Sequence, residues 1–207
     1  MLKSNKVIRR LSPGAPSTTL KGQQTSLAKV VAVSTLPVKY ANLLYRLVKH
    51  FKPAEIIELG TSAGITTLYL AAANESAQIH TIEGNPDMAE VASELFKKSG
   101  NSHIHLYKGL FSTCLPDVLH GCSGPDFVFL DGDHRSVAVM EHLARIIPCM
   151  PEQGVLVIDD IYWSRDMAKA WSTIKQLDGV SVTIDLYRMG LVFFKKNQAK
   201  QHFVLRF

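Results

Sequence analysis

The sequence predicts an α/β fold in which helices cover both faces of a doubly wound, seven-stranded sheet. Between residues 55 and 196, short apolar runs of strand length alternate with longer amphipathic runs. This alternation is typical of parallel strands buried on both faces. Near the end, two strand-like runs at 180–187 and 190–196 are separated only by Arg188 and Met189. So short a connection cannot join parallel strands, so the last strand should be antiparallel.

The individual elements follow from the spacing of apolar residues. After Pro37, which suits a first helical turn, apolar side chains recur at helical intervals and predict an amphipathic helix over 36–51. Apolar runs between turn residues predict strands at 55–59, 77–83, 103–109, 126–131, 154–160, 180–187 and 190–196. Helical spacing predicts helices at 63–74, 86–100, 136–150 and 166–177, with one more before 126.

Length and composition indicate one globular domain. The chain has 207 residues, of which 46% are hydrophobic and 20% charged, and no apolar run approaches the roughly 18 residues of a membrane span. The amino terminus is basic but lacks the apolar segment of a secretory signal, so a cytoplasmic location without membrane contact is expected. Residues 12–24 are rich in Pro, Gly, Ser and Thr. An irregular segment is therefore expected over 1–35, followed by a domain over 36–207.

Charge and cysteine content exclude some classes of function. The net charge of +5 does not indicate nucleic acid, because much of it lies at the two termini and no basic stripe with interleaved aromatic residues is evident. The terminal basic residues are Lys3, Lys6, Arg9, Arg10, Lys195, Lys196, Lys200 and Arg206. Cys114, Cys122 and Cys149 cannot all pair and form no C-x-x-C motif, so reduced thiols are expected.

The five residues from Gly60 to Gly64 match G-x-S-x-G and follow the first predicted strand of the sheet. A hydrolase nucleophile at Ser62 needs earlier strands and an upstream oxyanion loop, neither of which is evident. A glycine turn before a helix instead allows an anionic ligand to approach free N–H groups. Glu58 ends the preceding strand and Glu83, 25 residues later, ends the next, where an acceptor for ribose hydroxyls belongs. A nucleotide-like cofactor site is therefore favoured over a purely structural turn, which leaves Glu58 unexplained.

Acidic residues also end two later strands that should be neighbours. Asp131 and Asp133 follow one strand, and Asp159 and Asp160 follow the next. Four carboxylates at adjacent strand ends would repel each other unless a cation, a proton or a basic partner joined them.

The loop pattern E-x-G-x-x-x-G resembles motif I of the class I S-adenosylmethionine-dependent methyltransferases. The resemblance extends over about residues 36–196, and "FLDGDH" followed by "GVLVIDD" is most similar to small-molecule O-methyltransferases related to the catechol and caffeoyl-coenzyme A enzymes. It implies a Rossmann-like methyltransferase fold with S-adenosylmethionine as cofactor. In that fold Gly109, Leu110 and Phe111 match the stretch that flanks adenine.

The resemblance also implies a divalent metal. The positions matching Asp131, Asp159 and Asp160 ligate it in these O-methyltransferases, although an asparagine is common where Asp160 stands here. Oxygen ligands suit Mg²⁺ or Ca²⁺. His134 lies three residues after Asp131, where the catechol enzymes carry a basic residue, so these two are the candidate catalytic residues. The alternative is that Asp131 holds the cofactor and His134 is a surface residue.

The implied reaction is methyl transfer to the hydroxyl of a small molecule. RNA methylation is an alternative supported only by the net charge, and a non-catalytic nucleotide-binding module is another, since fold alone does not guarantee turnover. Tyr162 and Trp163 follow Asp160 and are expected either to wall an acceptor pocket or to pack on the next helix. The amino terminus and the helix from Leu36 are expected to contact a second subunit in a homodimer, or else to fold over their own domain.

Overall fold

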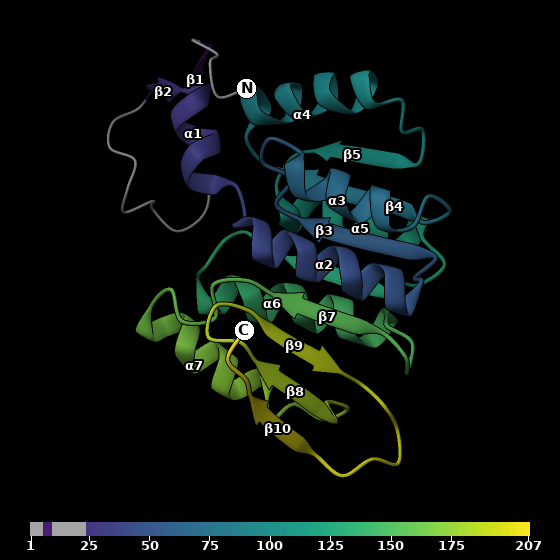
Figure 1. Cartoon of the computed structure of the whole chain (residues 1–207). Coiled ribbons are helices and arrows are strands. Elements are labelled where there is room, and N and C mark those ends of the chain that lie inside the picture. Colours follow the sequence, from purple (N-terminus) through teal and green to yellow (C-terminus); the bar gives the residue numbers. More distant parts are fainter. Residues whose placement is uncertain (1–5, 10–23) are drawn as a thin grey trace.

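The computed structural model describes residues 6–9 and 24–207, and an eight-stranded sheet flanked by helices dominates it (Figure 1). The strands of this sheet are β3 (Glu55–Leu59), β4 (Gln78–Glu83), β5 (Ile104–Lys108), β6 (Phe127–Leu130), β7 (Val155–Ile158), β8 (Val182–Asp185), β9 (Gly190–Phe193) and β10 (Gln201–Val204). The helices that follow or precede them are α2 (Val38–Phe51), α3 (Ile65–Ala73), α4 (Pro86–Ser99), α5 (Phe111–Gly121), α6 (Ser136–Ile146) and α7 (Arg165–Ile174).

The strand order confirms the predicted doubly wound sheet. It runs β10-β8-β9-β7-β6-β3-β4-β5, and β9 is antiparallel to both of its neighbours while the other pairs are parallel. The seven predicted strands are β3 to β9. The eighth, β10, was not predicted: it lies at the edge of the sheet beside β8, and its four residues are all exposed, so they lack the apolar alternation that marks a half-buried strand.

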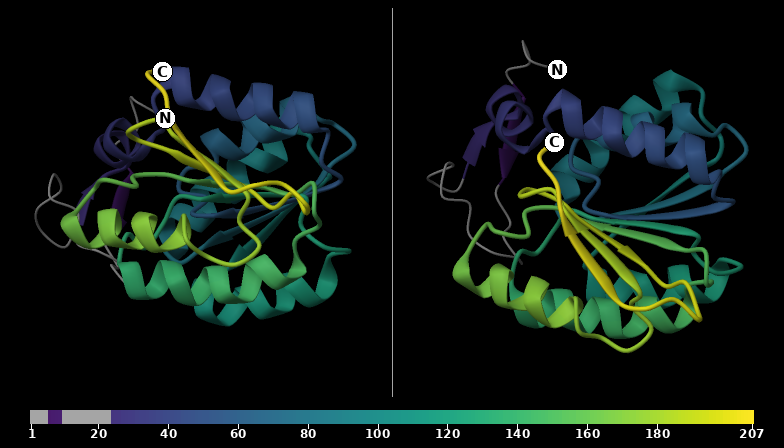
Figure 2. Two further views of the ribbon diagram at one scale, coloured as in Figure 1. Left: turned by 90° about the horizontal axis from the view of Figure 1, so that it is seen from below. Right: turned by 60° about the horizontal axis from the view of Figure 1, so that its bottom comes forward.

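The two faces of the sheet are covered by different helices (Figure 2). Side chains of α5, α6 and α7 pack on one face, with Trp171 among the largest fully buried groups. Side chains of α2 and α3 pack on the other, where Leu44 and Val48 are completely buried. Because both faces are buried, the strands read as continuous apolar runs in the sequence.

The predicted hairpin between β8 and β9 is present. Its turn is closed by a backbone hydrogen bond of 2.8 Å from Leu186 N to Met189 O, and Tyr187 adopts a positive φ of 66°. The Arg188 carbonyl accepts a hydrogen bond of 3.0 Å from Ile161 N, just beyond the end of β7. The turn therefore lies beside the acidic end of β7.

The described part of residues 1–35 is not irregular, which corrects that expectation. β1 (Val7–Arg9) pairs antiparallel with β2 (Gln24–Ser26), and α1 (Leu27–Ser34) follows. Ser26 caps α1, since its Oγ accepts from Lys29 N at 3.3 Å. Apolar side chains of this segment pack against the start of α3 and against α4. The expected Pro-, Gly-, Ser- and Thr-rich lead-in falls almost wholly on residues outside the described part, and the domain boundary at 36 stays a prediction.

Across residues 6–9 and 24–207, no single helix has the length and apolar character needed to cross a bilayer. Only α1 and α2 taken together are long and apolar enough, and this pair of helices is bent by 64° where α1 ends and α2 begins. The cytoplasmic location stays a prediction.

Candidate active site

The loop from Gly60 to Gly64 lies where β3 ends and α3 begins, against the end of β6. Gly60 has a φ of 108°, and a Cβ there would lie 2.1 Å from the carbonyl oxygen of Asp131. Gly64 has a φ of 82°, and a Cβ there would lie 2.7 Å from the ring of Phe96. Both positions therefore require glycine, and the loop brings bare backbone to the carboxyl edge of the sheet.

Glu83 is held rigidly beside this loop. Its Oε2 accepts a hydrogen bond of 2.7 Å from Ser62 N, and its Oε1 accepts one of 2.7 Å from Asn85 N. Burial raises the pKa of the Glu83 carboxyl, and these two backbone N–H groups oppose the rise. Because each carboxylate oxygen can accept a second hydrogen bond, Glu83 can still bind hydroxyl groups.

Ser62 is not arranged as a nucleophile. Its Oγ lies 2.9 Å from Oγ of Ser34, at the end of α1, whereas an activated serine needs a general base within hydrogen-bond reach. Its contribution to the loop is the backbone N–H that fixes Glu83. The hydrolase interpretation is therefore unsupported by the geometry.

Glu58 is completely buried at the end of β3. Its Oε2 accepts from Thr67 Oγ1 at 2.5 Å and from Thr81 Oγ1 at 2.6 Å, while its Oε1 is buried with no hydrogen-bond partner among residues 6–9 and 24–207. Burial raises the pKa of Glu58 to about 7, against the opposing effect of the two threonine hydroxyls. A buried acceptor without a donor calls for an explanation, and a bound ligand with an N–H group would supply one.

The predicted adenine-flanking stretch lies at the end of β5. Gly109 N donates a hydrogen bond of 2.9 Å to the carbonyl oxygen of Glu83, which connects this stretch to the loop. Phe111 begins α5 and meets His142 edge to face at 5.6 Å, while Leu110 is 46% exposed. Contact of these residues with adenine stays a prediction.

Asp159 and Asp160 are held by an arginine that the sequence analysis missed. Arg188 donates from Nε to Asp159 Oδ1 at 2.9 Å and from Nη2 to Asp159 Oδ2 at 2.7 Å. The same Nη2 lies 3.4 Å from Asp160 Oδ1. Asp159 is fully buried, and burial raises its pKa, while the hydrogen bonds from Arg188 oppose the rise.

Three of the four predicted carboxylates converge, not four. Burial raises the pKa of Asp131 well above its usual range, and the negative charges of Asp159 and Asp160 raise it further. Asp133 instead pairs with Arg135 on the surface, with 2.5 Å between Arg135 Nε and Asp133 Oδ1. From the sequence, a cation, a proton or a basic side chain could each have relieved the repulsion between these carboxylates. In the structure a basic side chain, Arg188, contacts Asp159 and Asp160.

The arrangement does not fit the expected divalent metal site. A metal needs several oxygens directed at one point, but the guanidinium of Arg188 already binds both oxygens of Asp159, and its positive charge would repel an ion there. Across residues 6–9 and 24–207, no three His, Cys, Asp or Glu side chains are grouped so that they could hold a metal ion. The sequence does show that Arg188 lies in the short turn of the predicted hairpin. It does not show that this turn lies beside the end of β7, so the contact with Asp159 could not be predicted.

His134 lies within the same group of side chains. Its Nε2 is 3.7 Å from Asp160 Oδ2, and its ring is 6.0 Å from the ring of Trp163. Tyr162 is directed elsewhere, because its hydroxyl donates to Asp185 Oδ2 at 2.5 Å. Burial and this bond raise the pKa of Tyr162 to about 12. Of the two predicted aromatic residues, Trp163 is therefore the one beside His134.

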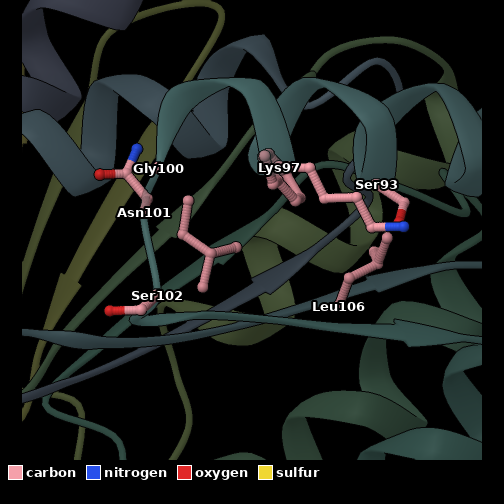
Figure 3. A pocket seen from close by; sticks show the side chains of 8 residues that line it. Ser93, Lys97, Gly100, Asn101, Ser102 and Leu106 are labelled. Atoms are coloured by element: carbon pink, nitrogen blue, oxygen red, sulfur yellow. The ribbon is translucent and has the colours of Figure 1, made fainter.

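A separate hollow of about 400 Å³ lies between α4 and the edge strand β5 (Figure 3). Ser93 and Lys97 of α4 line it together with the segment 100–102 and side chains of β5. None of the predicted site residues lines it. It is therefore distinct from the loop and carboxylates described above.

Comparisons with known proteins show which proteins this chain is similar to. A catechol O-methyltransferase from Niastella koreensis is 31% identical over 106 residues, which are 50% of this chain and 47% of that protein, so the match spans about half the length of the relative. Two solved O-methyltransferases share the fold. TomG from Streptomyces achromogenes, in complex with SAM, has a TM-score of 0.67 at 19% identity, over 78% of this chain and 82% of TomG.

The second is an O-methyltransferase from Bacillus cereus in complex with SAH, with a TM-score of 0.67 at 18% identity, over 81% of this chain and 90% of that protein. A Staphylococcus aureus protein assigned as a caffeoyl-CoA O-methyltransferase has a TM-score of 0.72 at 16% identity, over 81% and 88% of the two chains. The sequence model of one family, described as a methyltransferase domain, matches residues 57–161, about half of the chain. The chain therefore belongs to this family of methyltransferase domains.

Proposed function

We propose that this protein transfers a methyl group from S-adenosylmethionine to a hydroxyl group of a small molecule. The observation that carries the proposal is the Glu83 carboxylate, fixed by two backbone N–H groups beside the Gly60–Gly64 loop. It lies at the carboxyl edge of a parallel sheet, where such folds bind their ligands. The relative named as a catechol O-methyltransferase and the neighbours with bound SAM and SAH support both the cofactor and the reaction.

The Gly60–Gly64 loop and the two glutamates beside it suit S-adenosylmethionine, which supplies an electrophilic methyl group on a sulfonium. Gly60 gives a ligand access to the backbone, and the free lone pairs of Glu83 can accept from ribose hydroxyls. Oε1 of Glu58, which no donor in the described part of the chain reaches, is an acceptor for an ammonium group. Each of these residues was predicted to bind the cofactor, and each assignment stays a proposal.

His134 is the proposed general base for the acceptor hydroxyl. Asp160, 3.7 Å from its Nε2, is placed to stabilise the imidazolium that forms when the ring takes the proton. Trp163 supplies an aromatic surface beside the ring. We expect His134→Gln to lower kcat while the affinity for adenosylhomocysteine is unchanged, since the imidazole acts on the acceptor.

The cofactor assignment is tested by calorimetry with adenosylhomocysteine and with NAD. Wild type should bind adenosylhomocysteine, and Glu83→Ala should bind it about 10- to 100-fold more weakly, because hydrogen bonds to a charged group contribute about 1.5–3 kcal/mol. Glu75→Ala removes one exposed carboxylate and serves as the matched control. Binding of NAD without binding of adenosylhomocysteine would overturn the proposal.

The acceptor class is tested by a screen of phenols, glycosides and bulk RNA for labelled methyl transfer. RNA is the rival acceptor, and the net charge of +5 is its only support. Label in a phenol or a glycoside supports O-methylation of a small molecule. Selective label in RNA contradicts it, and cofactor binding without transfer to any acceptor favours a non-catalytic module.

A further inference from the structure

We propose that Arg188 takes the place of a divalent metal in this site, so that Asp159 and Asp160, at the end of β7, are joined by a cation of the protein itself. The inference rests on the proposed function, because it concerns how the same site is built. It departs from the metal dependence that the sequence resemblance implies.

The contacts of Arg188 are those of a fixed cation. Its guanidinium binds both oxygens of Asp159 and lies 3.4 Å from Asp160, so it bridges two of the three residues expected to ligate a metal. Charge-assisted bonds of this forked kind are roughly twice as strong as hydrogen bonds between neutral groups. The Asp159 side chain is completely buried and Arg188 is one-third exposed. The guanidinium therefore lies against Asp159 where an ion would bind, and a second cation would be repelled there.

Arg188 is also held from other directions. Its own backbone is fixed in the hairpin turn through the hydrogen bond from Ile161 N. Its guanidinium carbon lies 5.7 Å from the centre of the Tyr40 ring in α2, within the range of a cation–π contact. Tyr40 is backed by Phe207 at 5.6 Å, where the end of the chain meets the start of α2 (Figure 2). The guanidinium is thus positioned by three separate parts of the fold.

Metal binding would compete directly with this arrangement. An ion ligated by Asp159 and Asp160 would lie beside the positive guanidinium, which would repel it as long as Arg188 stays on Asp159. Removing the guanidinium should favour metal binding. Asp131, Asp159 and Asp160 would then be three acidic groups without a compensating positive charge, and their oxygens are ligands suited to Ca²⁺ or Mg²⁺. Loss of Arg188 should therefore let these three side chains, which form no metal site as they stand in the described part of the chain, close on an ion.

The experiment measures metal binding directly, with Ca²⁺ and Mg²⁺ alone as the probes in calorimetry. Wild type is compared with Arg188→Gln, with Arg188→Lys, which retains a cation, and with Arg135→Gln, which removes an arginine paired with a different aspartate at the same edge of the sheet. We expect Arg188→Gln to bind Ca²⁺ at least about tenfold more tightly than wild type, within the range of about 10⁻⁴ to 10⁻³ M seen for weak protein sites. Arg188→Lys and Arg135→Gln should behave as wild type does. In thermal unfolding, added Ca²⁺ should raise the Tm of Arg188→Gln alone.

Saturable one-to-one binding of Ca²⁺ or Mg²⁺ by the wild-type protein would overturn the inference, and so would an Arg188→Gln protein that is folded by circular dichroism but binds no more tightly. If Arg188→Gln does not fold, the wild-type titration and methyl transfer in the presence of EDTA still decide, because transfer abolished by EDTA and restored by Mg²⁺ contradicts the inference. Adenosylhomocysteine binding is measured on the same samples. Its absence would remove the proposed function without affecting the metal titration.

Discussion

The buried Glu58 should make the stability of the protein fall between pH 5 and pH 8, and Glu58→Gln should remove that fall. The carboxyl has a pKa of about 7 in the folded protein, against an ordinary value of 4.5, chiefly because it is buried. Between those two values the folded protein binds more protons than the unfolded chain, so the free energy of unfolding decreases as the pH rises. The stabilisation is present in full below pH 4.5 and is lost as the pH rises towards 7.

The size of the effect follows from the two values. One pKa unit corresponds to about 1.36 kcal/mol, so a carboxyl that titrates near 7 when folded and near 4.5 when unfolded changes stability by up to about 3 kcal/mol. Most of this change falls between pH 5 and pH 8 by the same linkage relation. In Glu58→Gln the amide does not titrate, so the substitution changes stability by the same amount at every pH. The difference between the two proteins should therefore change by about 2–3 kcal/mol across this interval.

Urea unfolding of both proteins at pH 5, 6, 7 and 8 measures this difference. Other buried carboxyls, such as Asp131 and Glu83, titrate in both proteins and largely cancel in the comparison. Glu75→Gln, at an exposed position, controls for the loss of one negative charge. Parallel profiles for wild type and Glu58→Gln from pH 5 to pH 8 would refute the reasoning, because they would mean that Glu58 is ionised in the folded protein throughout.

Three further predictions concern stability and assembly. Gly60→Ala should lower the free energy of unfolding by at least about 3 kcal/mol, because it adds a positive-φ penalty to a clash with backbone at 2.1 Å. In Gly100→Ala, where a Cβ meets nothing within 4 Å, the cost in thermal or urea unfolding should be only about 1–2 kcal/mol; equal costs would contradict this. Asp185→Ala should cost about 2–3 kcal/mol in urea unfolding, since it leaves Trp171 Nε1 and the Tyr162 hydroxyl without their acceptor. Tyr162→Phe should cost about 1 kcal/mol, and a cost as large as that of Asp185→Ala would place the effect elsewhere. If the proposed homodimer forms through α2 and the amino-terminal segment, light scattering should give twice the mass of one chain, and the mass of a single chain would exclude it.

The sequence by itself determined the strands β3 to β9 and the antiparallel direction of β9. Apolar runs of strand length and the two-residue gap at Arg188 and Met189 are local features, and local features report on local structure. The same holds for the loop at Gly60–Gly64, because its glycines are needed for backbone conformations within the loop. Glu58 and Glu83 could be placed beside it because parallel strands end at a common edge.

Only the tertiary structure decided which charges meet. Asp131, Asp133, Asp159 and Asp160 look alike in the sequence, yet Asp133 turns to a neighbouring arginine while Asp159 is bound by one 29 residues away. That pairing depends on where β9 is inserted in the sheet, since its position beside β7 brings the hairpin turn against the acidic strand ends. Strand order is set by the packing of whole layers and not by the residues of any one turn. The pairing of Arg188 with Asp159 therefore could not be predicted from the sequence, and only the tertiary structure shows it.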